Sequence, residues 1–371
     1  MARHEIEVDL SRPLAEQPET GHNRWHPDIP PIVRCAPRDE VVLQTRDALD
    51  GQITADSTIE DVAAVNLNVV HPLTGPVSVE GAEPGDLLAV EIVDVAPPSF
   101  GFTVQIPGFG FLRDTFTDPH IVRWHIEGGW ATSEDLPGVR IPGAPFMGTI
   151  GIAPVRELMR TIAAREQQLL DRGGVVLPPD PTDAIPSDPA IAAEALRTVP
   201  PRETAGNVDI KQLCAGTTLL IPVSAPGALF SAGDAHFAQG DCETCGTAIE
   251  ITSTLTVRFD LRKGVAAERG IRDPQFERDG YVVSAEFAAP RRFFATTGIC
   301  VTKDGRNESE DLSLAAKNAL LNMIDHLVAE YQYTPQQAYA LCSVAVDLRV
   351  SEVVDVPNLV VSAFLPLDIF T

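Results

Sequence analysis

The chain has 371 residues, 44% hydrophobic and 22% charged, a balance typical of a folded globular protein and not of a disordered or membrane-embedded one. Its 52 acidic and 28 basic residues give a formal net charge of -24, and such a field repels nucleic acids and anionic membranes, so neither is expected as a partner. We find no apolar run of about 18 residues and no basic, apolar leader, and we therefore expect a cytoplasmic protein.

Short strands dominate the structure expected for residues 1–175. The first forty residues contain several prolines and predict an irregular arm or edge strand laid on another part of the protein. From Val41 to Val95, apolar runs alternate with turn signals, which predicts antiparallel β structure. Residues 98–150 are rich in glycine and proline and predict long loops or short strands. Residues 156–172 then predict an amphipathic helix that ends at Gly173 and Gly174.

Residues 176–205 are rich in proline and predict a linker or an irregular excursion. Strands return in residues 206–371, where apolar side chains alternate with polar ones from Ile249 to Phe259. Helices follow toward the C-terminus. The expected class is therefore α+β and rich in β structure, with the three segments combined in one integrated fold, and a doubly wound sheet is disfavoured.

Two helices are expected in the C-terminal part. Asn307 and Glu310 predict the cap of the first helix. Its apolar stripe is expected to pack in the core and consists of Leu312, Ala316, Leu320, Ile324, Leu327 and Val328. The second helix is expected to begin at Thr334-Pro335 and to continue through Val350. Asp347 would then lie near a helix end, as either a buried polar contact to a functional site or a surface cap.

The segment from Ser231 to Glu250 concentrates groups that bind metals or move protons. Asp234 and His236 are two residues apart, so in an extended chain both side chains point to one side, where a cation could meet an oxygen and an imidazole. Asp241 and Glu243 have the same spacing, and the nearby glycines allow a tight loop that brings the two acidic pairs together. An ordinary Asp/Gly-rich turn explains any single residue here. The whole set indicates a site.

Five segments of the chain form a recognisable series. They are HNRWHPDIPP at 22–31, HPLTGPVSVEGAEPGDLLAVEIVDV at 71–95, GNVDIKQL at 206–213, GALFSAGDAHFAQGDCETCGTAIE at 227–250, and SVAVDLRVSEVVDVP at 343–357. In these motifs and in their order the chain resembles the acetamidase/formamidase family. The resemblance implies hydrolysis of the C–N bond of a small aliphatic amide to ammonia and a carboxylate. It also implies a β-sandwich-like portion joined to a smaller α/β portion, and a homo-oligomer.

The chain departs from the family pattern at three places. Cys242 stands where the family usually has the second glycine of GDGE, and Ala205 stands where it usually has the first glycine of GGNVDI. The segment Ala144-Pro145-Phe146-Met147-Gly148 lacks a His-Pro-Gly that formamidase-like members tend to carry before it. These differences concern which amide is preferred more than the reaction type.

We interpret the site as a metal centre that activates water, and zinc fits a set of imidazole and carboxylate ligands best. The expected ligands are Asp209, Asp234, His236 and His71, with calcium possible as a second ion. Glu243 is expected to act as general base and then as general acid. The other expected residues are Asp241 and Lys211 in catalysis, and Asn207, Gln239, Glu250 and Cys245 in substrate binding or support of the ligands.

Three alternatives are open at this level. Cys245 could be a nucleophile with His236 as its base, although the neighbouring carboxylates would raise the pKa of the thiol. The chain has six cysteines, and the single Cys242-x-x-Cys245 pair predicts neither a disulfide framework nor a complete zinc site. The protein could also hydrolyse another small C–N compound such as a urea, or bind a metal or ligand without catalysis.

Overall fold

The computed structural model describes residues 2–280 and 292–371, and its strands form a six-stranded sheet, an eleven-stranded sheet and two smaller ones. The six-stranded sheet is antiparallel except for the parallel pairing of its first two strands. Its strands, in spatial order, are β1 (Arg3–Ile6), β5 (Glu40–Thr45), β18 (Ser253–Arg262), β7 (Leu87–Ala96), β15 (Thr218–Pro222) and β19 (Gln275–Glu277).

The eleven-stranded sheet has β16 near its centre. Its main path is β11 (Arg140–Pro142), β10 (Trp130–Thr132), β9 (His120–Glu127), β8 (Phe100–Gln105), β17 (Glu250–Ile251), β16 (Phe230–His236), β12 (Phe146–Ile152) and β14 (Ala205–Asn207). A branch begins with β6 (Leu73–Val79), which pairs with β16, β2 (Gly21–His22) and β4 (Val33–Cys35). β16 therefore pairs with three strands, β6, β12 and β17, from separate parts of the chain.

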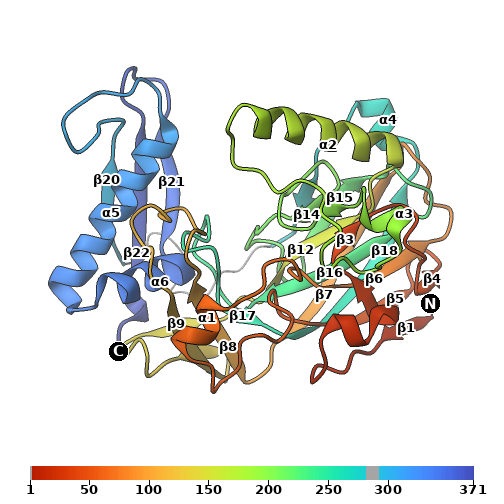
Figure 1. Cartoon of the computed structure of the whole chain (residues 1–371), viewed down its shortest axis with the longest axis horizontal. Helices are drawn as coiled ribbons and strands as arrows, with labels where there is room; N and C mark the ends of the chain where they lie inside the picture. The colour runs from red at the N-terminus through yellow and green to blue at the C-terminus, as the bar shows by residue number, and fades with distance from the viewer. Residues whose placement is uncertain (1, 281–291) are drawn as a thin grey trace.

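The two large sheets pack face to face as a sandwich (Figure 1). Phe230 of β16 meets Phe259 of β18 edge to face, with the ring centroids 5.0 Å apart. The apolar members of the alternating stretch 249–259 are buried in this core, while their neighbours Thr252, Thr254 and Thr256 are only partly buried. The predicted α+β class with a β-sandwich-like portion is confirmed.

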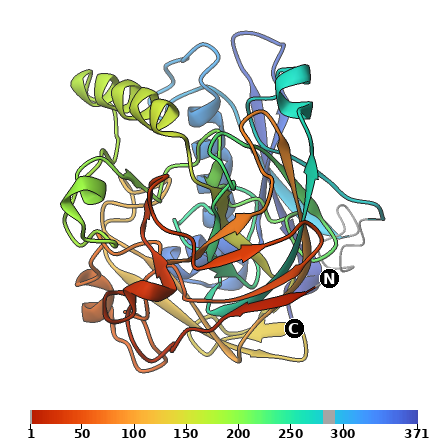
Figure 2. The same cartoon turned by 90° about the vertical axis from the view of Figure 1, so that its right-hand side faces the viewer.

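A smaller unit at the C-terminus completes the fold and stands beside the sandwich (Figure 1). Its three-stranded sheet has the order β20-β22-β21, and Figure 2 shows its helices behind the N-terminal strands. Its elements are β20 (Phe293–Gly298), α5 (Leu312–Tyr331), α6 (Pro335–Ala345), β21 (Asp347–Glu352), β22 (Val360–Pro366) and η3 (Leu367–Ile369).

Two predictions about this unit need correction. α5 is capped by Asp311, whose carboxylate accepts from the Leu314 amide at 2.9 Å, and not by Asn307 with Glu310. Asp311 is the N-cap residue because it lies directly before the first turn, where its carboxylate oxygen can reach a free backbone amide two or three residues further along. The second helix begins at Pro335 as predicted but ends at Ala345, so Asp347 is the first residue of a strand. The pairing of this segment with β22, from Asp347 opposite Phe364 onward, holds it as a strand.

The first forty residues, predicted as an arm, pair with strands of both large sheets: β1 with β5, and β2 and β4 with β6. Buried Arg24 donates to the carbonyl oxygens of Asp180 and Thr182, which ties the arm to the proline-rich stretch. The remaining elements are η1 (Leu14–Glu16), η2 (Pro18–Thr20), β3 (Arg24–Trp25) paired with β13 (Leu196–Arg197), α1 (Ile59–Ala63), α2 (Arg156–Asp171), α3 (Pro189–Ala192) and α4 (Val265–Arg269). α2 confirms the predicted helix. None of the helices in the described residues has the length and apolarity that crossing a membrane requires.

Candidate active site

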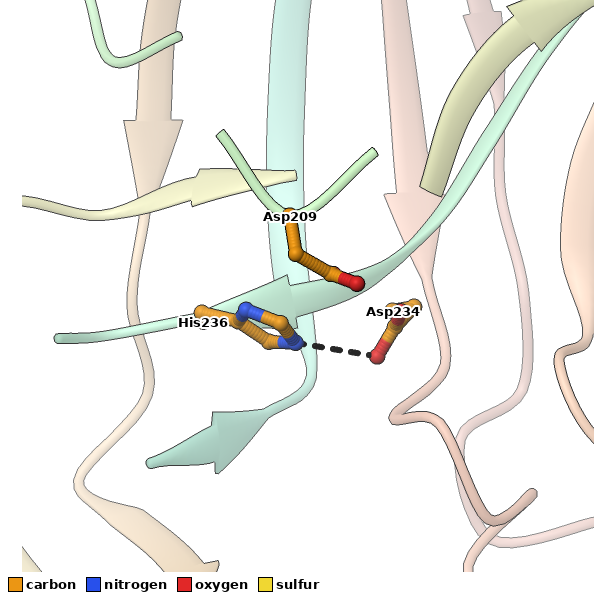
Figure 3. A group of neighbouring side chains, drawn as sticks. All are labelled: Asp209, Asp234 and His236. Carbon is orange, nitrogen blue, oxygen red and sulfur yellow. Dashed lines mark hydrogen bonds and ion pairs between the residues drawn. The ribbon is translucent and has the colours of Figure 1, made fainter. Parts of the chain in front are cut away.

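Strand β16 supplies the central pair of the site. Asp234 and His236 lie on the same side of the strand, and the Nε2 atom of His236 is 3.2 Å from Oδ1 of Asp234 (Figure 3). Both side chains are buried. The close approach of the two residues agrees with their spacing in the sequence, although Asp234 itself has a left-handed φ of 57°.

Three further carboxylates surround His236. Asp209 comes from the loop after β14, Glu243 from the loop after β16, and Glu250 from β17, where it faces His236 across the ladder. Nε2 of His236 is 3.6 Å from Glu243 Oε1 and 3.4 Å from Glu250 Oε1. Two groups of ligand atoms each lie within 4.8 Å of one another: Asp209, Asp234 and His236, and His236, Glu243 and Glu250.

Gly148 of β12 leaves the space in which the first group meets. A Cβ atom at this position would lie 2.6 Å from Cε1 of His236 and 2.7 Å from both Oδ1 of Asp209 and Oδ2 of Asp234. Any side chain here would therefore collide with all three residues. The local sequence does not indicate this role for Gly148, because the role depends on the pairing of β12 with β16.

Gln239 fixes the protonation of His236. Its Nε2 atom donates to the backbone oxygen of Asp209 at 2.8 Å, so its Oε1 atom faces Nδ1 of His236, also at 2.8 Å. Because an amide oxygen only accepts, Nδ1 must carry a proton, and a neutral imidazole then presents the lone pair of Nε2 to the carboxylates. A lone pair facing carboxylate oxygens is favourable only if a cation or a second proton lies between them.

The buried charges perturb one another strongly. Burial raises the pKa of Asp209 to about 8 and that of Glu250 to about 7, and burial together with Asp209 raises the pKa of Glu243 well above its ordinary value. Burial alone would lower the pKa of His236, but Glu250, Asp234 and Glu243 outweigh it and raise that pKa well above 6.5. The four carboxyl groups could not all be ionised beside one imidazole, so without a further cation some of them retain protons near neutral pH.

These features fit a divalent cation. Asp209 Oδ1 is buried and has no hydrogen-bond partner, which is costly for a carboxylate oxygen unless another group meets it. Asp209 and Asp234 offer oxygen ligands and His236 offers an imidazole nitrogen, a donor set that suits zinc. The space kept open by Gly148 lies against the same three residues.

His71 and Asn207 lie beside this group. Burial lowers the pKa of His71, and a charge on His71 would lower the pKa of Asp234. The groups of close ligand atoms found in the described residues do not include His71. Asn207 reaches the site indirectly, because the Thr149 hydroxyl lies 2.8 Å from its Oδ1 and 3.0 Å from Oδ2 of Asp234. No spacing in the sequence indicates this contact of Thr149 with Asp234.

Asp241 and Lys211 belong to a second group. Lys211 forms an ion pair with Asp347 and lies 3.7 Å from Asp241 Oδ1. The expectation that Asp241 and Glu243 join Asp234 and His236 in one cluster is therefore wrong for Asp241. The cause is local, because left-handed backbone at Cys242 and Glu243, with φ of 81° and 43°, turns the two carboxylates apart.

Cys245 is poorly placed to act as a nucleophile. Its thiol is buried and lies 3.5 Å from the carbonyl oxygen of Thr247 and 3.7 Å from that of Val104. Burial raises its pKa to about 11, which keeps it a thiol at neutral pH. Its neighbour Cys242 is exposed, and the groups of close metal-ligand atoms found among the described residues include neither cysteine.

Comparisons with known proteins extend over nearly the whole chain. The sequence model of the Acetamidase/Formamidase family matches residues 7–371. The formamidase of Methylophilus methylotrophus is 36% identical over 98% of this chain and 93% of its own length. The acetamidase of Mycolicibacterium smegmatis is 36% identical over 90% of this chain and 87% of its own. The solved γ-lactamase of Delftia acidovorans superposes with a TM-score of 0.93 at 36% identity, covering 100% of this chain and 93% of that chain.

Proposed function

The chain belongs to the acetamidase/formamidase family and hydrolyses amide C–N bonds, and on that premise we propose that its substrates are small aliphatic amides of the formamide or acetamide type. The names of the two curated relatives support this substrate class. The observation that carries the proposed chemistry is the convergence of Asp209, Asp234 and His236 on the space beside Gly148. Family membership also favours an enzyme over a non-catalytic binding protein.

Asp209, Asp234 and His236 would hold the divalent cation, with zinc as the expected metal. A cation bound there would polarise the amide carbonyl and make water a stronger nucleophile at neutral pH. Gln239 keeps Nε2 of His236 free to bind by holding the proton on Nδ1. His71 and a second ion such as calcium remain predictions.

Glu243 is the residue we propose for proton transfer. As a base, its carboxylate takes a proton from the water whose oxygen forms the new bond to the carbonyl carbon. As an acid, it returns that proton to the amide nitrogen, so the C–N bond breaks and ammonia leaves while the acid product remains. The raised pKa of Glu243 suits the second step, because the protonated form is then accessible near neutral pH. Glu250 faces His236 from the neighbouring strand and supports it.

A cyclic amide is a second candidate substrate. The γ-lactamase relative matches the entire chain at a TM-score of 0.93. Hydrolysis of a lactam breaks the same kind of bond but opens a ring, so the nitrogen stays in the product and no ammonia is released. The two candidates are therefore separated by their products. A urea-like substrate remains a third possibility from the sequence.

The test is a substrate panel with two site variants. Purified protein is assayed for ammonia with formamide, acetamide, propionamide and urea, and for the ring-opened amino acid with a γ-lactam. Glu243→Gln is expected to lower kcat by roughly 100- to 10,000-fold, the usual range for a general acid or base, and His236→Ala to abolish turnover. The exposed His125, which pairs with Glu127, offers the control His125→Ala. Wild-type kcat in Glu243→Gln would contradict the proposed role.

Two properties of the whole protein also stay proposals. We retain the expectation of a homo-oligomer, which light scattering of the purified protein would measure directly. We also retain a cytoplasmic location, which cell fractionation would test. Neither bears on the chemistry proposed for Glu243 and His236.

A further inference from the structure

The site combines two kinds of support. Asp234, His236 and Glu250 lie on paired strands of the large sheet. Asp209 and Glu243 come from two loops, and both have left-handed backbone, with φ of 47° and 43°. A strand in a sheet keeps its side chains in fixed positions because the neighbouring strands hold its backbone. A loop needs other contacts to do the same. The positions of these two carboxylates therefore depend on what holds the loops.

Asp347 contacts both loops at once. Its carboxylate pairs with the ammonium group of Lys211, two residues beyond Asp209, and accepts from the backbone amide of Asp241 at 3.1 Å, two residues before Glu243. Arg349 donates to its other oxygen at 3.1 Å. Asp347 is 8% exposed, so these contacts are shielded from water.

The second loop also rests on the helix that precedes Asp347. The amide of Gly240 donates to the carbonyl oxygen of Ser343 at 2.9 Å, and the amide of Cys245 donates to the Ser343 hydroxyl at 3.0 Å. That hydroxyl donates in turn to the carbonyl oxygen of Thr247 at 2.7 Å. The loop from 240 to 247 is thus attached at both ends to the last turn of α6.

These contacts make the junction of α6 and β21 a support for the reacting groups, although none of its side chains reaches them. We propose that Asp347 is a positioning residue for amide hydrolysis, which joins the Asp209 loop to the Glu243 loop through Lys211 and the Asp241 amide. The inference rests on the proposed roles of Asp209 and Glu243. Loss of its charge removes the ion pair of a largely buried lysine and loosens both loops.

The test compares Asp347→Asn with a matched control, Asp86→Asn. Asp86 is also buried and bound to one lysine, Lys263, with backbone amides as its other donors, but it lies in a turn away from the site. Both variants are measured for thermal midpoint, for kcat and KM with the best amide of the panel, and for zinc affinity after chelation.

Asp347→Asn is expected to lower kcat by about 10- to 100-fold with little change in KM, and to weaken zinc binding by a similar factor, as losses in the support of ligands usually do. Asp86→Asn is expected to lower the thermal midpoint but to retain wild-type kcat. Folded Asp347→Asn with wild-type kcat and zinc affinity would overturn the inference, as would an equal loss of kcat in Asp86→Asn.

Lys211→Gln provides a second variant if Asp347→Asn does not fold. It removes the other half of the ion pair, and wild-type kcat and zinc affinity in that protein would also overturn the inference. Absence of amide turnover in the wild-type protein would instead contradict the proposed function. The zinc affinities of the variants would still decide whether Asp347 positions the ligands.

Discussion

Gly148 shows how one residue without a side chain defines the site. Its backbone lies on β12, opposite the strand that carries Asp234 and His236, and the space where its Cβ would be is bordered by three candidate ligands. Nothing in the local sequence distinguishes it from a glycine in an ordinary turn. Its importance appears only when the strand that begins at Phe146 pairs with the one that begins at Phe230.

Replacement of Gly148 by alanine should abolish metal binding while preserving the fold. The added methyl group would meet side-chain atoms of His236, Asp209 and Asp234 and displace the donors from one another, a local overpacking that costs about 1–3 kcal/mol. Zinc content by atomic emission should fall from near stoichiometric to background, with the circular dichroism spectrum unchanged. A Gly148→Ala protein that retains zinc with wild-type affinity would show that the cation does not bind here.

At the scale of elements, local sequence patterns predicted the features that depend on neighbouring residues alone. The alternation from Ile249 to Phe259 predicted a half-buried strand, and the glycines after residue 172 predicted the end of α2. The spacing of Asp234 and His236 predicted their shared side of β16. Each of these features depends on residues within a few positions of one another, so the sequence alone contains the signal.

The remainder of the site depends on contacts between distant segments. Glu250 is one of the polar residues in the alternating stretch from Ile249 to Phe259, but the structure buries it beside His236, a residue of the neighbouring strand. Asp209 entered the predicted site through the family resemblance, since no spacing links it to His236. Asp347 was placed on a helix because the apolar run of α6 continues in sequence into β21. Such errors arise where tertiary pairing overrides local propensity.

The loop between β16 and β17 offers a prediction at this scale. A Cβ atom on Gly240 would lie 2.8 Å from the carbonyl oxygen of Cys342 and closer still to that of Val346. Both are backbone atoms at the packed end of α6, so they cannot move aside as easily as the tip of a side chain. Gly240→Ala should therefore shift the loop and move Glu243 away from the substrate. We expect kcat to fall by about 100-fold, the scale of a 1 Å misplacement.

Zinc affinity is the control for that variant. The proposed ligands Asp209, Asp234 and His236 lie outside the loop, so equilibrium zinc binding should stay within about threefold of the wild type. Wild-type turnover in Gly240→Ala would mean that the position of Glu243 is not critical. Loss of turnover together with complete loss of zinc would mean that the whole site had collapsed.

At the scale of the molecule, 52 acidic residues make stability sensitive to acid wherever a carboxylate is buried and paired. Asp86 joins the turn before β7 to the turn before α4. Burial alone would raise its pKa, but the Lys263 ammonium and the amides of Gly264 and Glu83 outweigh burial and hold that pKa below its ordinary value. Because the pKa is depressed in the folded state, the ionised group stabilises the fold above its ordinary pKa, and this contribution disappears as pH falls through the folded value.

The thermal midpoint of Asp86→Asn should therefore depend on pH in a defined way. At pH 7 the variant should melt below the wild type by an amount on the order of 1–4 °C. The difference should shrink as pH falls below about 4, where the free carboxyl becomes protonated. Differential scanning fluorimetry from pH 7 to pH 3 checks this, and a constant difference across that range would rule out ionisation of Asp86 as the cause.

We propose that amide hydrolysis by this protein depends on a divalent cation held by Asp209, Asp234 and His236. The most direct measurement is ammonia release from formamide and acetamide by the purified protein before chelation, after chelation and after zinc is restored, with metal content measured at each stage. We predict that turnover disappears with the metal and returns in proportion to the zinc bound. Turnover that continues at full rate in protein free of metal would contradict the claim.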